Sequence, residues 1–160
     1  MDLRPFRPAD LTPLLELTIA TFGPFFEDSF RSIVGDAVMT NQHGTWRADY
    51  REMWVGLHDP EQNKHVVVAE EGGTLLGFAA WQVDPEKRSG EIDIIGVAAD
   101  QRRHHVGTAL CTHAFDAMRR SGVEVVSIGT GGDRFHDSAR AFYDSLGMTA
   151  MPLVRYYLAL

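Results

Sequence analysis

The stretch from Gly90 to Cys111, GEIDIIGVAADQRRHHVGTALC, constrains the fold of this chain more than any other segment. Its first half becomes apolar from Ile94 to Val97, which predicts a buried strand. Its second half is a turn rich in arginine and histidine that leads into an amphipathic helix. The first amides of a helix have no acceptor within the helix, and its dipole adds partial positive charge there. This order of strand, basic turn and helix therefore predicts a site for a ligand that carries phosphate.

The remaining chain predicts a mixed α/β protein, and its length favours a single domain over residues 1–160. We expect Asp10 to cap the first helix and Gly23-Pro24 to end it. Further breaks are expected near Gly35 and at His43-Gly44. The expected elements are strand 3–7, helix 10–22, one or two helices in 25–62, hairpin 65–83, strand 90–97, helix 106–121, strand 123–128, helix 137–146 and two short strands in 148–160.

Composition and charge exclude several classes of function. The formal net charge of −7 argues against nucleic acid as a partner and mildly favours cationic substrates. No apolar run is long enough to span a membrane, and the N-terminal MDLRPFRPAD has no hydrophobic signal region. We therefore expect a cytoplasmic protein. The one cysteine, Cys111, cannot form an internal disulfide and is expected to be a buried, inert thiol.

Residues 25–62 combine acidic and aromatic side chains. One interpretation is a substrate wall, in which aromatic rings stack on the ligand and carboxylates attract an ammonium group. The alternative is that the rings belong to the core and the acids form a solvated face, and this alternative is favoured for most of these residues. The candidates for substrate contacts are Phe26, Trp46, Tyr50 and Trp54.

Two motifs in this sequence resemble those of the GNAT N-acetyltransferases. The first is the pyrophosphate-loop signature R-x-x-G-x-G, and the residues that match it and its surroundings are Val97, Asp100, Arg102, Val106, Gly107, Ala109 and Leu110. Ala99 replaces a common proline, and His105 replaces the first motif glycine. The second motif, A-x-x-F-Y-x-x-x-G-F, is matched by ARAFYDSLGM from Ala139 to Met148.

The resemblance implies a GNAT fold, with a central mixed, mostly antiparallel sheet that is splayed between strands four and five and has helices on both faces. It also implies acetyl-CoA as the co-substrate and no metal. By the same resemblance, backbone amides of the splayed strand bind pantetheine and the loop binds pyrophosphate. The implied cofactor-binding residues are Ile95, Gly96, Val97, Arg102, Arg103, His104, His105, Val106, Gly107, Thr108, His136, Ala139 and Phe142. At Gly96 the missing side chain suits close approach of a ligand to the backbone.

The resemblance also implies the catalytic residues. Tyr143 aligns with a tyrosine that protonates the departing thiolate, and a phenol has a proton available for this at neutral pH. Glu91 aligns with a glutamate that serves as general base. Asp93 points to the same face of the strand and shares this role as a candidate. The other usual position for a glutamate, on strand five, is absent from VVSIGT.

The expected function is therefore transfer of an acetyl group from acetyl-CoA to a primary amine, with a small cationic amine such as a polyamine or an aminoglycoside-like compound as substrate. Two alternatives stay open. One is acetylation of protein N-termini or lysines, and the other is a non-catalytic domain that binds CoA as a sensor. Expected partners are a small-molecule or peptide amine, without nucleic acid or membrane, and a homodimer is one option for the oligomeric state.

Overall fold

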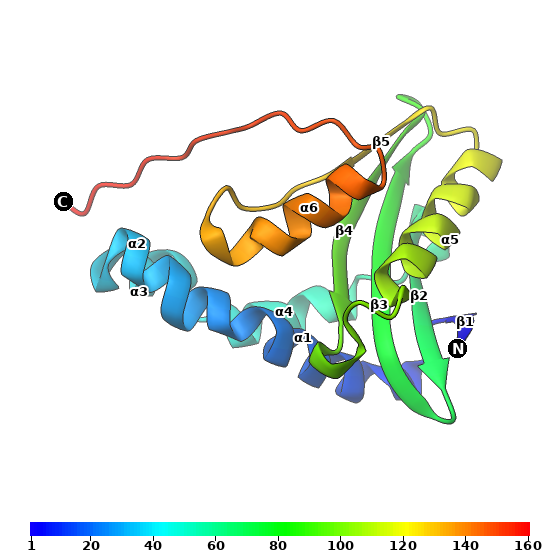
Figure 1. Cartoon of the computed structure of the whole chain (residues 1–160), viewed down its shortest axis with the longest axis horizontal. Coiled ribbons are helices and arrows are strands. Elements are labelled where there is room, and N and C mark those ends of the chain that lie inside the picture. The colour runs from blue at the N-terminus through cyan, green and yellow to red at the C-terminus, as the bar shows by residue number, and fades with distance from the viewer. The chain divides into compact units, whose positions relative to one another are not determined.

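In the computed structural model, which describes residues 1–160, a five-stranded sheet runs in the order β1-β2-β3-β4-β5. β1 to β4 pair antiparallel with their neighbours, whereas β4 and β5 are parallel. This confirms the predicted mixed, mostly antiparallel sheet (Figure 1). The strands are Asp2–Pro5, Lys64–Glu71, Thr74–Asp84, Ser89–Val97 and Val125–Ile128.

The chain divides into two compact units, which are described separately. The first unit contains residues 1–21 and 49–129, and the second contains residues 22–48 and 130–160. The whole sheet lies in the first unit. The single domain expected over residues 1–160 stays a prediction.

The β2–β3 hairpin follows directly from local sequence. Gly72 and Gly73 adopt φ values of 57° and 82°, a conformation that glycine accepts without a steric penalty. Two residues with positive φ make the tight turn whose twist matches that of antiparallel strands. Val66 to Ala69 are all buried, so both faces of β2 are covered by other elements. The predicted hairpin over 65–83 is confirmed.

The helix α5, Val106–Arg120, covers one face of the sheet (Figure 1). Its buried side chains recur at helical spacing, and Gly122, with φ 81°, follows its end as the sequence predicts. Cys111 is 1% exposed, and burial raises the pKa of its thiol to about 11. The core between α5 and the sheet contains Val67, Ala69, Leu76, Ala79, Trp81, Ile92, Val106, Leu110, Ala114, Met118 and Val123.

The opposite face of the sheet packs against the helices α1, Leu11–Pro24, and α4, Trp46–Val55. The ring of Trp54 meets that of Phe78 on β3 at a centroid distance of 4.9 Å. Trp54 also donates a hydrogen bond from Nε1 to the Thr18 hydroxyl over 3.0 Å. Helices therefore cover both faces, as predicted.

The first α-helix ends at Pro24, as predicted, but the chain does not leave the helical conformation there. α1 includes Pro24 and continues directly into the π-helical turn Phe25–Phe30 and the helix α2, Arg31–Val34. Proline lacks the N–H that a regular helix requires, and helices tolerate this loss where the winding is irregular. The predicted breaks are confirmed, because Gly35, with φ 84°, and Gly44 flank the helix α3, Asp36–His43.

Asp10 has a different partner from the one predicted. Its carboxylate does not cap the first helix but receives hydrogen bonds of 2.7 and 2.8 Å from the Arg4 guanidinium. The Arg7 amide donates a further bond of 2.7 Å to the same carboxylate. Single 3₁₀ turns occur at Pro8–Asp10, Pro60–Gln62, Ala99–Gln101 and Arg134–His136.

In the second unit, the helix α6 spans Asp137–Ser145 and is followed by Gly147, with φ 79°. No side chain caps its first turn, so the predicted cap by Asp137 or Ser138 is wrong. The two short strands predicted in 148–160 are also absent. Apolar alternation favours a strand only where a neighbouring strand completes the hydrogen-bond ladder.

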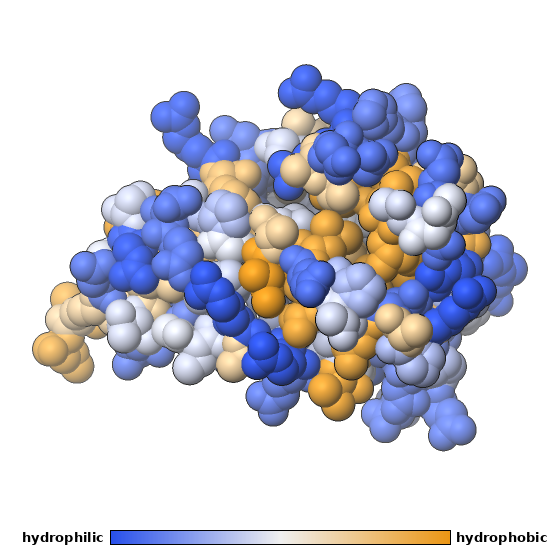
Figure 2. Space-filling model, turned by 90° about the horizontal axis from the view of Figure 1, so that it is seen from below, coloured by the Kyte–Doolittle hydropathy of each residue, from blue (hydrophilic) through white to orange (hydrophobic).

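Several large apolar side chains of this C-terminal segment are exposed, among them Tyr156 at 90% and Leu158 at 82%. On the face shown in Figure 2, apolar residues likewise appear among a larger number of hydrophilic ones. None of the helices combines the length and apolar content that crossing a bilayer requires.

Candidate functional site

The turn between β4 and α5 has an unusual backbone. Arg103 and His105 adopt φ values of 65° and 62°, a left-handed conformation that is uncommon for residues other than glycine. His105 thus occupies the conformation that the motif glycine would adopt at lower cost. The side chains from Arg102 to His105 are all exposed. The loop therefore keeps the geometry expected of a glycine motif without the glycine.

His105 is also the N-cap of α5, and no side chain satisfies the first amides of this helix. The first turn of α5 contains no acidic residue. Left-handed residues beside a helix N-terminus orient successive N–H groups into a concave anion site. Together with Arg102 and Arg103, these amides fit the two charged phosphates of a diphosphate group.

β4 and β5 pair over only part of their length. Their register extends from Ser89–Val125 to Ile92–Ile128, so β4 continues without β5, paired only with β3, as far as Val97. This is the splay that the family resemblance implies. On this side, Ile95 to Val97 have no neighbouring strand, so their backbone groups suit an extended ligand such as a pantetheine chain.

Packing, and not only the approach of a ligand, explains why residue 96 is a glycine. A Cβ atom placed there would lie 2.7 Å from Cε1 of Phe78, and Phe78 is completely buried. The glycine is therefore required by packing on the α1 and α4 side of β4. No bulge occurs at Gly96, because Gly77 to Ala79 pair with Val97 to Ile95 in regular register.

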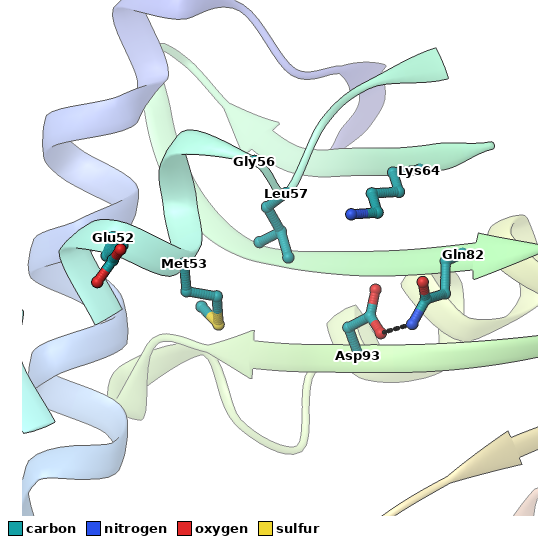
Figure 3. Close-up of a pocket in the computed structure, with 7 residues that line it drawn as sticks. All are labelled: Glu52, Met53, Gly56, Leu57, Lys64, Gln82 and Asp93. Carbon is teal, nitrogen blue, oxygen red and sulfur yellow. Dashed lines mark hydrogen bonds between the residues drawn. The ribbon is translucent and has the colours of Figure 1, made fainter. Parts of the chain in front are cut away.

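The bulge lies instead at Asp93. Trp81 pairs with Ile92 and Ala80 pairs with Ile94, so Asp93 has no partner across the ladder. Bulges of this kind redirect a side chain and are frequent beside active sites. The carboxylate of Asp93 accepts a hydrogen bond of 2.8 Å from the Gln82 amide (Figure 3).

Asp93 lies in a pocket of about 360 Å³ on the α4 side of the sheet (Figure 3). Burial raises the pKa of the Asp93 carboxyl, and the negative charge of Glu91 raises it further. The Gln82 hydrogen bond and the charge of Lys64 act in the opposite direction but leave the pKa raised. A carboxylate with a raised pKa accepts protons more readily, as a general base requires. The pocket is lined by Glu52, Met53, Gly56, Leu57, Lys64, Gln82 and Asp93.

Glu91 lies on the same face as Asp93. Gly90 and Ile92 face α5, because Ile92 belongs to the α5 core and a side chain at Gly90 would meet Met118. Glu91 between them therefore points to the other face, where it is exposed and pairs across the ladder with Gln82. The two carboxylates interact electrostatically, but only Asp93 lines the pocket.

Lys64 and Gln82 were not recognised from sequence. Both are polar residues in strands whose other side chains are mainly apolar, and this contrast was the available signal. Their proximity to Asp93 depends on strand register, since Lys64 pairs with Gln82 and β3 pairs with β4. No short motif encodes it.

In the second unit, the candidate cofactor residue His136 is held by an acid. Its Nδ1 lies 2.7 Å from a carboxylate oxygen of Asp133, and its ring meets that of Phe25 at 4.7 Å. Burial raises the pKa of Asp133, but the hydrogen bond and charge of His136 outweigh burial and the pKa is lowered. His136 is therefore oriented as a hydrogen-bonding group rather than a free surface side chain.

α6 supplies the remaining candidates of the second unit. Ala139, Phe142 and Tyr143 are half-buried, and the rings of Phe142 and Tyr143 lie 5.4 Å apart. The tyrosine is thus on the helix expected from the second motif. Its role as the acid that protonates the thiolate stays a prediction.

Three of the four aromatic candidates for substrate contacts are interior side chains. Phe26 and Trp46 stack at 5.2 Å and are 9% and 3% exposed, and Trp54 is 3% exposed against Phe78. Tyr50 is half-buried, and burial raises the pKa of its phenol to about 12. The burial of these rings favours the core interpretation that the sequence had left open.

A mixed sheet that is splayed between two parallel strands, followed by a basic loop at a helix N-terminus, is the arrangement expected of the GNAT fold. Comparison with known families agrees, since the model of the acetyltransferase (GNAT) family matches residues 26–148. The chain belongs to this family.

Individual relatives match a smaller part of the chain than the family model does. Mycothiol acetyltransferase from Beutenbergia cavernae is 30% identical over 91 residues, which is 57% of this chain but only 30% of that protein. The match therefore covers less than a third of the relative's length.

Among solved structures, a protein described as an acetyltransferase of the GNAT family from Desulfovibrio desulfuricans superposes with a TM-score of 0.72 at 19% identity, over 94% of this chain and 86% of the other. An aminoglycoside antibiotic 6'-N-acetyltransferase from Acinetobacter haemolyticus gives 0.71 at 18% identity, over 100% and 99%. These likenesses support the fold.

Proposed function

We propose that this protein transfers an acetyl group directly from acetyl-CoA to the primary amine of a small molecule that arrives as a cation. The observation that carries the proposal is the part of β4, Asp93–Val97, that β5 does not pair, which leads into a left-handed loop at the N-terminus of α5. This arrangement combines an exposed strand edge with a diphosphate site, and CoA contains an extended chain joined to a diphosphate.

When bound, acetyl-CoA supplies an acetyl group activated as a thioester. Asp93 accepts a proton from the acceptor ammonium, because an alkylammonium with a pKa near 10.4 is mostly charged at neutral pH. The free amine then forms the C–N bond as the C–S bond breaks; Tyr143 protonates the departing sulfur, and the nitrogen releases its second proton through solvent, which restores the phenol. Glu91 supports the base by raising the pKa of Asp93. In this mechanism Asp93 is the general base, and Glu91 acts by raising the pKa of Asp93.

The small cationic acceptor is supported by the pocket and by a neighbour. Two carboxylates, Asp93 and Glu52, line the pocket, and Glu91 adds negative charge near it. The similarly folded protein from Acinetobacter haemolyticus is an aminoglycoside acetyltransferase. Aminoglycosides and polyamines are therefore the first acceptors to assay.

Calorimetry with acetyl-CoA tests the cofactor half of the proposal. Arg102→Glu should weaken binding about 10- to 100-fold, because it replaces a charge-assisted phosphate contact by repulsion. The control is Arg88→Glu, since Arg88 pairs with Glu124 and lies outside the loop. Equal affinity of wild type and the Arg102 variant would refute the phosphate site.

Transfer is tested by release of CoA in the presence of an amine panel. Tyr143→Phe should lower turnover about 10²- to 10⁴-fold while acetyl-CoA affinity holds. Acetylation of peptides but of no small amine would favour a protein substrate. Tight acetyl-CoA binding without transfer to any amine or peptide would instead indicate a CoA-binding sensor.

A further inference from the structure

The pocket beside Asp93 contains a lysine that acetyl transfer does not require. Lys64 is the first residue of β2, is half-buried, and projects into the same space as Asp93 (Figure 3). Its charge lowers the pKa of Asp93, so the two groups interact through space. No carboxylate oxygen lies within 4.0 Å of the Lys64 ammonium. The pocket therefore holds a cation and an anion that face one volume without forming an ion pair.

The pocket keeps these two charges apart. Gln82 donates its side-chain amide to Oδ1 of Asp93, which orients the carboxylate toward β3 and leaves Oδ2 for another donor. Met53 and Leu57 provide apolar surface on the α4 side (Figure 3). An apolar wall lowers the local dielectric and strengthens each unpaired charge toward a ligand.

We infer that the acceptor carries a carboxylate as well as a primary amine, so that the ammonium meets Asp93 and the carboxylate meets Lys64. This inference rests on the proposed function and narrows its acceptor class to small amino acids. A half-buried ammonium without a partner is stabilised by a ligand anion. In contrast, the second ammonium of a polyamine in this pocket would be repelled by Lys64.

The other carboxylate of the pocket, that of Glu52, does not make the pocket favour a second ammonium over a ligand carboxylate. Glu52 is on α4, is exposed, and lies beyond Met53 from Lys64 in the close-up (Figure 3). Solvent screens an exposed carboxylate, so its attraction for a distal ammonium is weak. Asp93 is exposed as well, but the Gln82 hydrogen bond fixes its carboxylate in the pocket beside Lys64. Lys64 is more enclosed, and its effect on the ligand is correspondingly larger.

The test compares acceptors that differ only in charge. Acetyl transfer is measured for β-alanine, γ-aminobutyrate and ε-aminocaproate, and for the carboxamide of each. The wild type should favour at least one carboxylate over its amide by about 10- to 100-fold in kcat/KM, the range expected for a charge-assisted hydrogen bond. Lys64→Gln should reduce that ratio below about fivefold. The ratio is the readout, because loss of the Lys64 charge also changes the pKa of Asp93 and so affects the carboxylate and its amide alike.

Lys87→Gln is the matched control, because Lys87 is the other lysine of the chain and is exposed beside Asp84. Lys87→Gln should keep the wild-type ratio of kcat/KM between each carboxylate and its amide. Lys64→Arg should retain part of it, and unchanged acetyl-CoA affinity in every variant shows that the fold is intact.

Two results separate the inference from the function on which it rests. If the wild type acetylates amines with equal efficiency whether or not they carry a carboxylate, or if Lys64→Gln keeps the preference, the assignment of Lys64 is wrong and the proposed function stands. If acetyl-CoA binds but none of these compounds, putrescine or an aminoglycoside is acetylated, the small-amine function fails, and the inference fails with it.

Discussion

Replacing Gly96 by alanine distinguishes two reasons for the glycine in β4. If the residue serves only the approach of a ligand, the variant should fold normally and lose affinity for acetyl-CoA. If it serves packing, the variant should be destabilised without any ligand. The structure favours packing, because the new Cβ atom would lie 2.7 Å from Cε1 and 3.1 Å from Cζ of Phe78. Ordinary carbon contacts are about 3.5–4.0 Å.

The size of the effect follows from how little Phe78 can move. Its ring is 0% exposed and is packed against Trp54 at 4.9 Å. Extra methyl groups in such a core cost about 1–3 kcal/mol. Alanine returns about 0.4–1 kcal/mol by restricting the unfolded chain. A net loss of roughly 1–2 kcal/mol should lower the melting temperature by roughly 2–8 °C for a protein of this size.

Thermal unfolding without acetyl-CoA measures this loss. Gly129→Ala is the control, because a Cβ atom at Gly129 meets nothing within 4 Å. Phe78→Leu in the Gly96→Ala background should recover part of the loss, with a coupling energy of about 0.5–3 kcal/mol between these contacting sites. If Gly96→Ala melts with the wild type while its affinity for acetyl-CoA falls, the packing argument is refuted and the ligand-approach interpretation returns.

Three further predictions concern the loop, the base and the N-terminal ion pair. His105→Gly removes a left-handed penalty of about 1–2 kcal/mol and should raise the melting temperature slightly. The variant should bind acetyl-CoA as tightly as the wild type from acidic to neutral pH. If its affinity is lower and the difference grows as pH falls, the His105 imidazolium contacts a phosphate. Glu91→Gln should move the acid limb of the pH–rate profile to lower pH, because the pKa of Asp93 is raised first by burial and then by Glu91. If Glu91→Gln instead lowers the rate at neutral pH and the rate recovers at high pH, Glu91 is the base. Asp10→Asn should cost about 2 kcal/mol at neutral pH, which thermal unfolding measures. The Arg4 guanidinium holds the pKa of Asp10 low, so this contribution is present above the unfolded pKa of about 3.9 and lost as pH falls through the folded pKa. A constant difference between the two proteins down to acid pH would contradict it.

The sequence predicted those elements whose signals are local. The hairpin is specified by Gly72-Gly73 and its flanking apolar runs, and α5 by its apolar stripe and Gly122. The basic loop before α5 was recognised for the same reason, since strand, turn and helix follow one another within about twenty residues.

The failures have a different cause. The chain stays helical after Pro24, because the π-helical turn Phe25–Phe30 follows α1 directly, and no propensity rule states this. Residues 148–160 have a strand-like pattern but form no strand, because a strand also requires a neighbour.

The candidate site was predicted only in part for the same reason. Asp93 was named from its position, but the bulge that leaves it unpaired and its place in the pocket lining depend on strand pairing. Lys64 and Gln82 join it through the pairing of three strands. Trp46 and Trp54 were candidates by residue type, and their burial depends on tertiary packing that periodicity does not report.

The burial of Cys111 has a practical consequence for enzymology. Acetyl transfer releases the free thiol of CoA, which a chromogenic disulfide reagent detects continuously. Cys111 is the only cysteine of the chain, is 1% exposed, and has a thiol pKa raised to about 11. Because thiolates rather than thiols attack such reagents, the folded enzyme should contribute almost no colour. High enzyme concentrations can then be used to screen poor acceptors, and any slow rise in colour from protein alone reports unfolding.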